Sequence, residues 1–162
     1  MLPIIRKTSL SIVLTFFVLS ANSQLVTSIA NGVWNDPAIW SGGVIPTSVT
    51  ATQIIVDHEV VLPAGYSVST FNLILNNRLT LNSGASLTIL EDVLTSVPDL
   101  LVTGTLTGED GAALNGTTSA NTSFASGSVY IHRQGPLGFI PLATWDHNST
   151  LVIAGFKGSG YI

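Results

Sequence analysis

The sequence contains no cysteine, so neither a disulfide nor a cysteine-ligated metal site is available to this chain. Small exported domains often rely on disulfides when their hydrophobic core is too small to hold the fold. This chain has 162 residues, of which 46% are hydrophobic, enough for one domain with a substantial core. We therefore expect a fold that is held together by packing and hydrogen bonds alone.

Charge is also scarce, because only 9% of the residues are Asp, Glu, Lys or Arg, against about 25% in a typical domain. After the first 23 residues the basic side chains are Arg78, Arg133 and Lys157. A surface for nucleic acid or anionic lipid needs clustered cations, so we exclude both as partners. The polar residues are mainly Ser, Thr and Asn, which suit the strands and turns of an exported β-protein.

Residues 1–23 have the three parts of a secretory signal peptide. Arg6 and Lys7 form the positive region, residues 10–19 form an apolar run, and Ala-Asn-Ser precedes a cleavage point before Gln24. The run is shorter than the roughly 18 residues of a membrane-spanning helix, and no later stretch reaches that length. We expect an exported protein, extracellular or on the outer cell surface, with no membrane span in the mature chain. A buried N-terminal helix is the alternative.

Residues 24–50 contain a tryptophan-rich motif, NGVWNDPAIWSGGVIP, at Asn31–Pro46. Trp34 and Trp40 bracket an Asp-Pro pair and precede a Gly-Gly pair, which together predict a compact loop. Each indole can bury a large area, so we expect both to plug the end of a β-structure. A cap of this kind suits a solenoid, whose terminal coil otherwise exposes its core. Alternatively, the two rings form a stacking platform for sugar rings.

Short apolar runs separated by turn residues occupy residues 51–162. Residues 54–56 and 60–62 flank the polar stretch Asp57-His58-Glu59, a pattern typical of two strands around a corner. No stretch after the N-terminal segment shows helical spacing over three turns. We predict an all-β protein with little helix.

The spacing of the leucines supports a repeating unit of one strand and one turn. Leu79 and Leu87 are eight residues apart, and so are Leu81 and Ile89. Both pairs are therefore expected to point the same way.

Two stretches interrupt this rhythm. Residues 91–101 contain Pro98, so we expect a short helical turn or a bulged loop there. Residues 107–128 are rich in Gly, Ala, Asn, Ser and Thr, and we interpret them as a long surface loop between rungs. Long loops often carry function, so this one is a candidate binding surface.

The densest ionisable cluster lies at the first corner, where strand alternation would put Asp57 and Glu59 on one face. Two carboxylates in this arrangement could bind Ca²⁺ or act as an acid and a base. Calcium needs six to eight oxygens, however, and no other acidic residue is near in the sequence. We favour a solvated corner, and we assign no catalytic or metal-ligating residue.

Aromatic residues provide the candidate contacts for carbohydrate, namely Trp34, Trp40, Tyr130 and Trp145. A polysaccharide lyase would also need clustered carboxylates with an Arg or Lys base on one face. The acidic pairs at residues 91–92 and 109–110 would contribute to such a cluster if stacked coils brought them together.

The tryptophan motif and the rungs that follow it resemble the N-terminal β-rich module of large secreted and surface proteins of the Bacteroidetes. Those proteins often read G-x-W-x-D-P-x-x-W-x-x-G-x-x-P, and the resemblance extends over residues 31–155. It implies a parallel β-helix or similar β-solenoid, and export through a route that reads a C-terminal sorting domain. The sequence ends at Ile162 without such a domain, so we expect the front end of a longer protein or a truncated reading frame.

The resulting hypothesis is a non-catalytic structural or adhesive module of an exported protein, with polysaccharide or other cell-surface components as its partners. The alternatives are the N-terminal part of a carbohydrate-active β-helix enzyme, a lyase or hydrolase, or a carbohydrate-binding module. We also expect the solenoid to be incomplete at its C-terminal end, with Ile153, Phe156 and Ile162 near a bare last coil.

Overall fold

The computed structural model describes residues 24–92, 97–133 and 140–154. Within them the chain is all-β, as predicted, and its only helical elements are two 3-10 turns. The predicted signal peptide lies outside the described residues. In chain order the elements are β1 (Leu25–Thr27), β2 (Gly32–Val33), η1 (Pro37–Ile39), η2 (Ser41–Gly43), β3 (Gln53–Val56), β4 (Val60–Leu62), β5 (Ser67–Thr70), β6 (Asn72–Leu75), β7 (Arg78–Leu81), β8 (Ser86–Ile89), β9 (Leu100–Val102), β10 (Thr105–Gly108), β11 (Ala113–Asn115), β12 (Thr122–Phe124), β13 (Val129–His132), β14 (Thr144–Trp145) and β15 (Thr150–Ile153).

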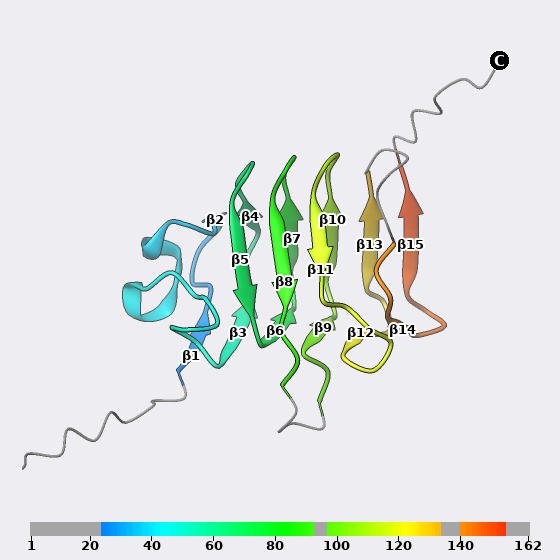
Figure 1. The fold of residues 1–162 in the computed structure, drawn as a ribbon, viewed down its shortest axis with the longest axis horizontal. Coiled ribbons are helices and arrows are strands. Elements are labelled where there is room, and N and C mark those ends of the chain that lie inside the picture. Colours follow the sequence, from blue (N-terminus) through cyan, green and yellow to red (C-terminus); the bar gives the residue numbers. More distant parts are fainter. Residues whose placement is uncertain (1–23, 93–96, 134–139, 155–162) are drawn as a thin grey trace, which may run out of the picture.

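The strands pair in parallel and build three sheets. The first sheet has the order β1-β3-β6-β9-β12-β14, the second β2-β4-β7-β10-β13-β15, and the third β5-β8-β11. Successive circuits of the chain, here called coils, visit the sheets in turn and stack side by side (Figure 1). The architecture is therefore the parallel β-solenoid that the sequence predicted.

Alternate residues of each strand point into the core, and the parallel register stacks them in columns. The predicted eight-residue spacing is confirmed, because Leu79, Leu81, Leu87 and Ile89 are all buried. β7 and β8 belong to different sheets and meet at a corner, so both strands face the same core. One inward column of the second sheet consists of Val60, Leu79, Leu106, Tyr130 and Leu151.

The corner between the second and third sheets repeats a glycine in three successive coils. Gly65, Gly84 and Gly111 have φ values of 69°, 70° and 71°, in the left-handed region that favours glycine. Another corner needs a glycine for a different reason: a Cβ on Gly104 would lie 1.9 Å from the carbonyl oxygen of Asn77. The first corner thus needs glycine for its backbone conformation, whereas glycine at the second lets adjacent coils approach closely.

The N-terminal end of the stack is closed by the tryptophan motif. Trp34 and Trp40 are buried, with ring centroids 5.0 Å apart and planes at 63°. The indole N–H of Trp34 donates to the carbonyl of Pro46 at 3.1 Å, and that of Trp40 donates to the carbonyl of Trp34 at 2.8 Å. Asp36 starts η1 by accepting a hydrogen bond from the Ala38 N–H at 2.9 Å. The plug interpretation of this motif is therefore confirmed.

The interpretation of residues 107–128 as a long surface loop is wrong, because this stretch contains β11, β12 and the end of β10. Only alternate side chains of a strand must be apolar, and here Ala112, Leu114 and Phe124 supply the inward contacts. The outward residues Asn115 and Ser123, and the buried Thr122, are polar and mask the pattern. The end of residues 91–101 is likewise strand β9, and residues 93–96 lie outside the described residues.

At the other end of the described stack, core-facing side chains are partly exposed, whereas the tryptophan motif covers the N-terminal end. β14 and β15 are the last strands of the first and second sheets. Leu151 and Ile153 continue the inward columns of Tyr130 and His132, yet they are 41% and 56% exposed. Ile153 is thus exposed at this end of the described stack, and whether the last coil is bare stays a prediction, since Phe156 and Ile162 lie outside the described residues.

Candidate functional site

Three of the four aromatic residues considered for carbohydrate contact are unavailable to a ligand. Trp34, Trp40 and Tyr130 are at most 1% exposed, so no sugar ring can stack on them. For these three residues the carbohydrate prediction is wrong, because the two indoles close the N-terminal end of the stack and the phenol ring of Tyr130 packs inside a coil. Burial also raises the pKa of Tyr130 to about 12.

Trp145 is the partly exposed member of the four, and it belongs to an aromatic cluster inside the last two coils. Its ring stacks on Phe124 with centroids 4.0 Å apart and planes at 3°, and it lies 6.3 Å from Tyr130. The Tyr130 hydroxyl in turn lies 3.4 Å from Nδ1 of His132. One face of the Trp145 ring is therefore used in packing, which limits any contact with a sugar ring to the remaining surface.

Asp57 belongs to a polar ladder that links three coils. Its Oδ1 accepts a hydrogen bond from Nδ2 of Asn76 at 2.7 Å, and Oδ1 of Asn76 accepts one from the Thr103 hydroxyl at 2.9 Å. Nδ2 of Asn77 also donates to the backbone carbonyl of Asp57 at 3.1 Å. The Asp57 carboxylate is thus part of the corner that holds successive coils in register.

Glu59 is engaged by a different neighbour. Its Oε1 lies 3.8 Å from Nη1 of Arg78, and both side chains are about half exposed. The residue between the two carboxylates, His58, places Nδ1 2.8 Å from the carbonyl oxygen of buried Ser28. The predicted polar corner is therefore present, but Asp57 and Glu59 make separate contacts to the next coil.

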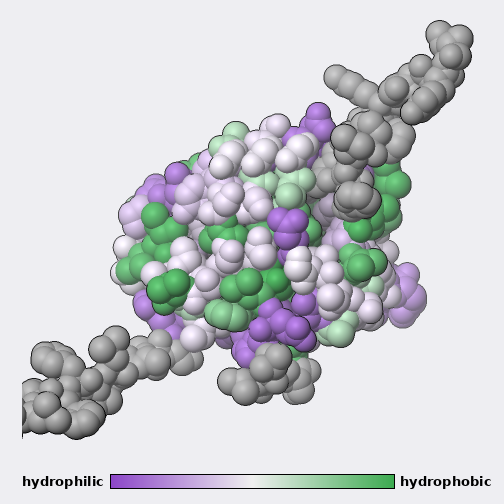
Figure 2. All heavy atoms as spheres, viewed as in Figure 1, coloured by the Kyte–Doolittle hydropathy of each residue, from purple (hydrophilic) through white to green (hydrophobic). Residues whose placement is uncertain are grey.

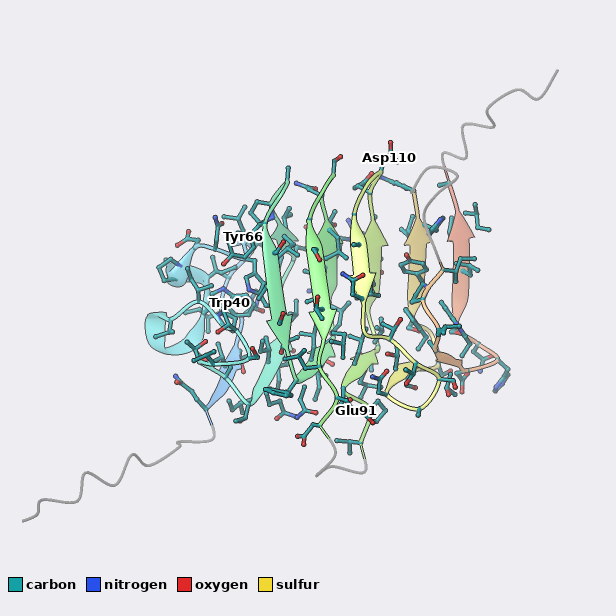
Figure 3. All side chains as sticks on the ribbon, in the orientation of Figure 1. Trp40, Tyr66, Glu91 and Asp110 are labelled. Carbon is teal, nitrogen blue, oxygen red and sulfur yellow. The ribbon has the colours of Figure 1, made fainter. Side chains whose placement is uncertain are left out.

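The acidic pairs at residues 91–92 and 109–110 are not brought together. Figure 3 shows Glu91 and Asp110 at opposite edges of the stack. Residues 91–92 follow β8, at the corner that leads back to the first sheet. Residues 109–110 follow β10, at the corner that leads into the third sheet. Glu109 instead forms an ion pair of 3.1 Å with Arg133 of the next coil.

Sequence reasoning missed Asp99, which is only 3% exposed at the start of β9. Its Oδ1 accepts a hydrogen bond from the Asp92 N–H at 3.2 Å, while Nδ2 of Asn72 donates to the Asp92 carboxylate. Burial raises the pKa of Asp99, and the charges of Asp92 and Glu91 raise it further. The sequence signal was its place after Pro98 and directly before an apolar strand.

The outer surface carries few charges and many small polar side chains. Figure 2 shows apolar residues scattered among hydrophilic ones on the face in view. The described residues contain no group of three or more His, Cys, Asp or Glu side chains that could hold a metal ion. Within the same residues, no helix is long and apolar enough to cross a membrane.

No protein-family model, curated protein or solved structure matches this chain. The geometry of the chain itself is therefore the basis for a functional proposal.

Proposed function

We propose that this chain is a non-catalytic structural or adhesive module of an exported protein, secreted or held at the outer cell surface. The observation that carries the proposal is that the candidate chemical side chains serve the packing of the solenoid. Trp34 and Trp40 close its end, and Asp57 ties one coil to the next. A stack of this kind suits a spacer or contact surface, with polysaccharide or other cell-surface components as partners.

The competing function is cleavage of a polysaccharide. The test is to incubate the purified chain with a panel of soluble polysaccharides, with and without Ca²⁺, and to measure new reducing ends and unsaturated products. We expect no turnover under any condition. Calcium-dependent turnover that disappears in the variant Asp57→Asn/Glu59→Gln would overturn the proposal and assign chemistry to the corner.

Glycan binding without cleavage is tested through Trp145, the partly exposed tryptophan. Intrinsic fluorescence should change with an adhesive glycan only if that glycan contacts the last coils. Trp145→Phe is the matched variant, because it keeps an aromatic ring against Phe124. A saturable signal that is lost in this variant would identify a carbohydrate-binding module, whereas contact through a surface away from Trp145 leaves the signal unchanged.

Export is part of the proposal and has its own test. When the full sequence is expressed in a bacterium with a general secretion system, the secreted product should begin at Gln24. Mass spectrometry of the extracellular or periplasmic fraction measures that N-terminus. A product that keeps Arg6 and Lys7 and stays in the cytoplasm would contradict the export assignment.

A further inference from the structure

Two Asn-Gly pairs lie at corners of the solenoid: Asn31-Gly32 at the start of β2, and Asn115-Gly116 at the end of β11. Asparagine is among the chemically labile residues of proteins. Glycine has no side chain to shield its backbone nitrogen, so that nitrogen can attack the side-chain amide of a preceding asparagine. Both asparagines are exposed. From the sequence alone, the two pairs therefore have the same chemical liability.

The first pair is held by one residue of the next coil. Oδ1 of Asn31 accepts a hydrogen bond from the Glu59 N–H at 2.9 Å, and the Gly32 N–H donates to the Glu59 carbonyl at 3.0 Å. Ile39 packs over Gly32, where an added Cβ would lie 2.7 Å from Cγ2 of the isoleucine. The attacking nitrogen and the side-chain amide of this pair are thus fixed in separate contacts.

The second pair lacks these restraints. Asn115 is the last residue of β11, and Nδ2 of its side chain donates to Oγ of Ser86 at 3.1 Å. Gly116 follows the strand with φ of 75°. Within the part of the chain that the structure describes, the Gly116 N–H forms no hydrogen bond. The nitrogen of Gly116 is therefore available to the exposed Asn115 side chain.

We propose that Asn115 is a site of spontaneous deamidation in the folded protein, and that the contacts with Glu59 protect Asn31 from the same reaction. The inference rests on the fold and is independent of the proposed function. The Gly116 nitrogen loses its proton to water and attacks Cγ of Asn115. The new N–Cγ bond closes a five-membered succinimide, and the Cγ–Nδ2 bond breaks to release ammonia. Water then opens the ring at either of its two carbonyl carbons, which leaves aspartate or isoaspartate.

The reaction changes this corner in two ways. It adds one negative charge to a chain whose formal net charge is −4. Isoaspartate also places an extra carbon in the main chain directly before Gly116, where an added Cβ would lie 2.0 Å from the carbonyl oxygen of Ile89. Because the coils are packed this closely, isoaspartate should loosen the end of β11 from β8.

The first test compares the two asparagines in one sample of the full chain. The chain is incubated in mildly alkaline buffer, either folded or in urea, and is then briefly digested with trypsin. Cleavage after Arg78 and Arg133 separates Asn31 from Asn115. Tandem mass spectrometry measures the gain of about 1 Da at each asparagine.

In the folded chain we expect Asn31 to react at least about tenfold more slowly than Asn115, because Asn31 reacts only after local opening of the fold. In urea the two rates should converge. Equal rates in the folded chain, a faster reaction at Asn31, or a difference that persists in urea would each overturn the proposal.

The second test follows the acidic species that appears on isoelectric focusing as the chain ages. Asn115→Gln should lose this species, because the longer side chain would have to close a six-membered ring. Asn148→Gln is the matched control. Nδ2 of Asn148 also donates to a serine hydroxyl, that of Ser126 at 3.2 Å, but the N–H of the following Ser149 is bonded to the Asp146 carbonyl. The species should persist in Asn148→Gln, and its formation at the same rate in Asn115→Gln would overturn the proposal.

Discussion

The indole N–H of Trp40 donates a hydrogen bond of 2.8 Å to the backbone carbonyl of Trp34, and the two rings meet edge to face. This contact folds residues 34–40 over the first coil and satisfies a buried polar group on each side. Because stacked coils depend on their neighbours, the contact protects the whole N-terminal end of the solenoid.

Replacement of Trp40 by alanine should therefore lower the free energy of unfolding by about 3–5 kcal/mol, the range for large aromatic truncations in a core. Trp40→Phe should cost less, because it keeps most of the ring but leaves the Trp34 carbonyl unpaired. Urea unfolding followed by circular dichroism measures both. Val49→Ala, at a residue that is 93% exposed, is the control and should leave stability almost unchanged. Equal stability of Trp40→Ala and the wild type would contradict the plug.

Two corners of the solenoid have a glycine for different physical reasons: Gly104 avoids a steric clash, and Gly127 has a positive φ. Gly104→Ala should be strongly destabilising, because its Cβ would lie 1.9 Å from the Asn77 carbonyl oxygen and force two coils apart. Gly127 has φ of 79° but no neighbouring atom within 4 Å of an added Cβ, so Gly127→Ala should cost only about 1–2 kcal/mol of backbone strain. Thermal unfolding of the two variants measures the difference. The same melting temperature for both would contradict the close approach of the coils at Gly104.

The ladder from Asp57 through Asn76 to Thr103 should contribute modestly to stability. Asn76→Ala removes a donor to Asp57 and an acceptor from Thr103, and its exposed position limits the loss to about 1 kcal/mol. Asn115→Ala, which removes one hydrogen bond to Ser86 between the paired strands β11 and β8, is the matched control. Urea unfolding of Asp57→Ala, Asn76→Ala and the double variant Asp57→Ala/Asn76→Ala measures the coupling between the two residues. Full additivity would show that Asp57 and Asn76 do not interact.

Asp99 should make stability depend on pH. Burial raises its pKa in the folded protein above the ordinary aspartate value of 3.8, so the folded state holds the proton more tightly than the unfolded chain. The stabilisation is complete below pH 3.8 and is lost as the pH rises through the folded-state pKa. Asp99→Asn keeps an oxygen that can accept from the Asp92 N–H, and it should be more stable than the wild type at pH 7.

The advantage of Asp99→Asn should shrink toward pH 3.5, where the wild-type carboxyl is mostly protonated in both states. Unfolding curves at the two pH values provide the comparison. Asp36→Asn is the control, because asparagine also caps a helical turn and Asp36 is not buried in the core. A loss of stability that is equal at both pH values would contradict the role of the buried charge.

Sequence patterns predicted the fold correctly where the structure depends on residues that are neighbours in the sequence. Trp34 and Trp40 next to Pro and Gly predicted a plug, and alternation around Ile54 and Leu79 predicted strands. The signal failed at residues 107–128, because three-residue strands need only one or two apolar side chains, and their polar residues Asn115, Thr122 and Ser123 resemble a loop.

The contacts between coils were less predictable than the strands. Asp57 meets Asn76, and Glu109 meets Arg133, only because the coils have particular lengths, and a single sequence does not reveal that register. Asp99 was missed for a related reason, since its burial at the start of β9 depends on how the coils stack. The local corner at Asp57-His58-Glu59 was identified, but its partners in neighbouring coils were not.

The most direct test of a capped solenoid is residue-resolved hydrogen exchange on the wild type and Trp40→Ala. We expect the wild-type amides of β3, β6 and β7 to be strongly protected, since each lies between two strands of the stack. In Trp40→Ala, protection should fall first in β1 to β4 and remain high in β9 and β10, because each coil depends mainly on its neighbours. Loss that begins in β9 and β10, or no loss in β1 to β4, would contradict the capped solenoid.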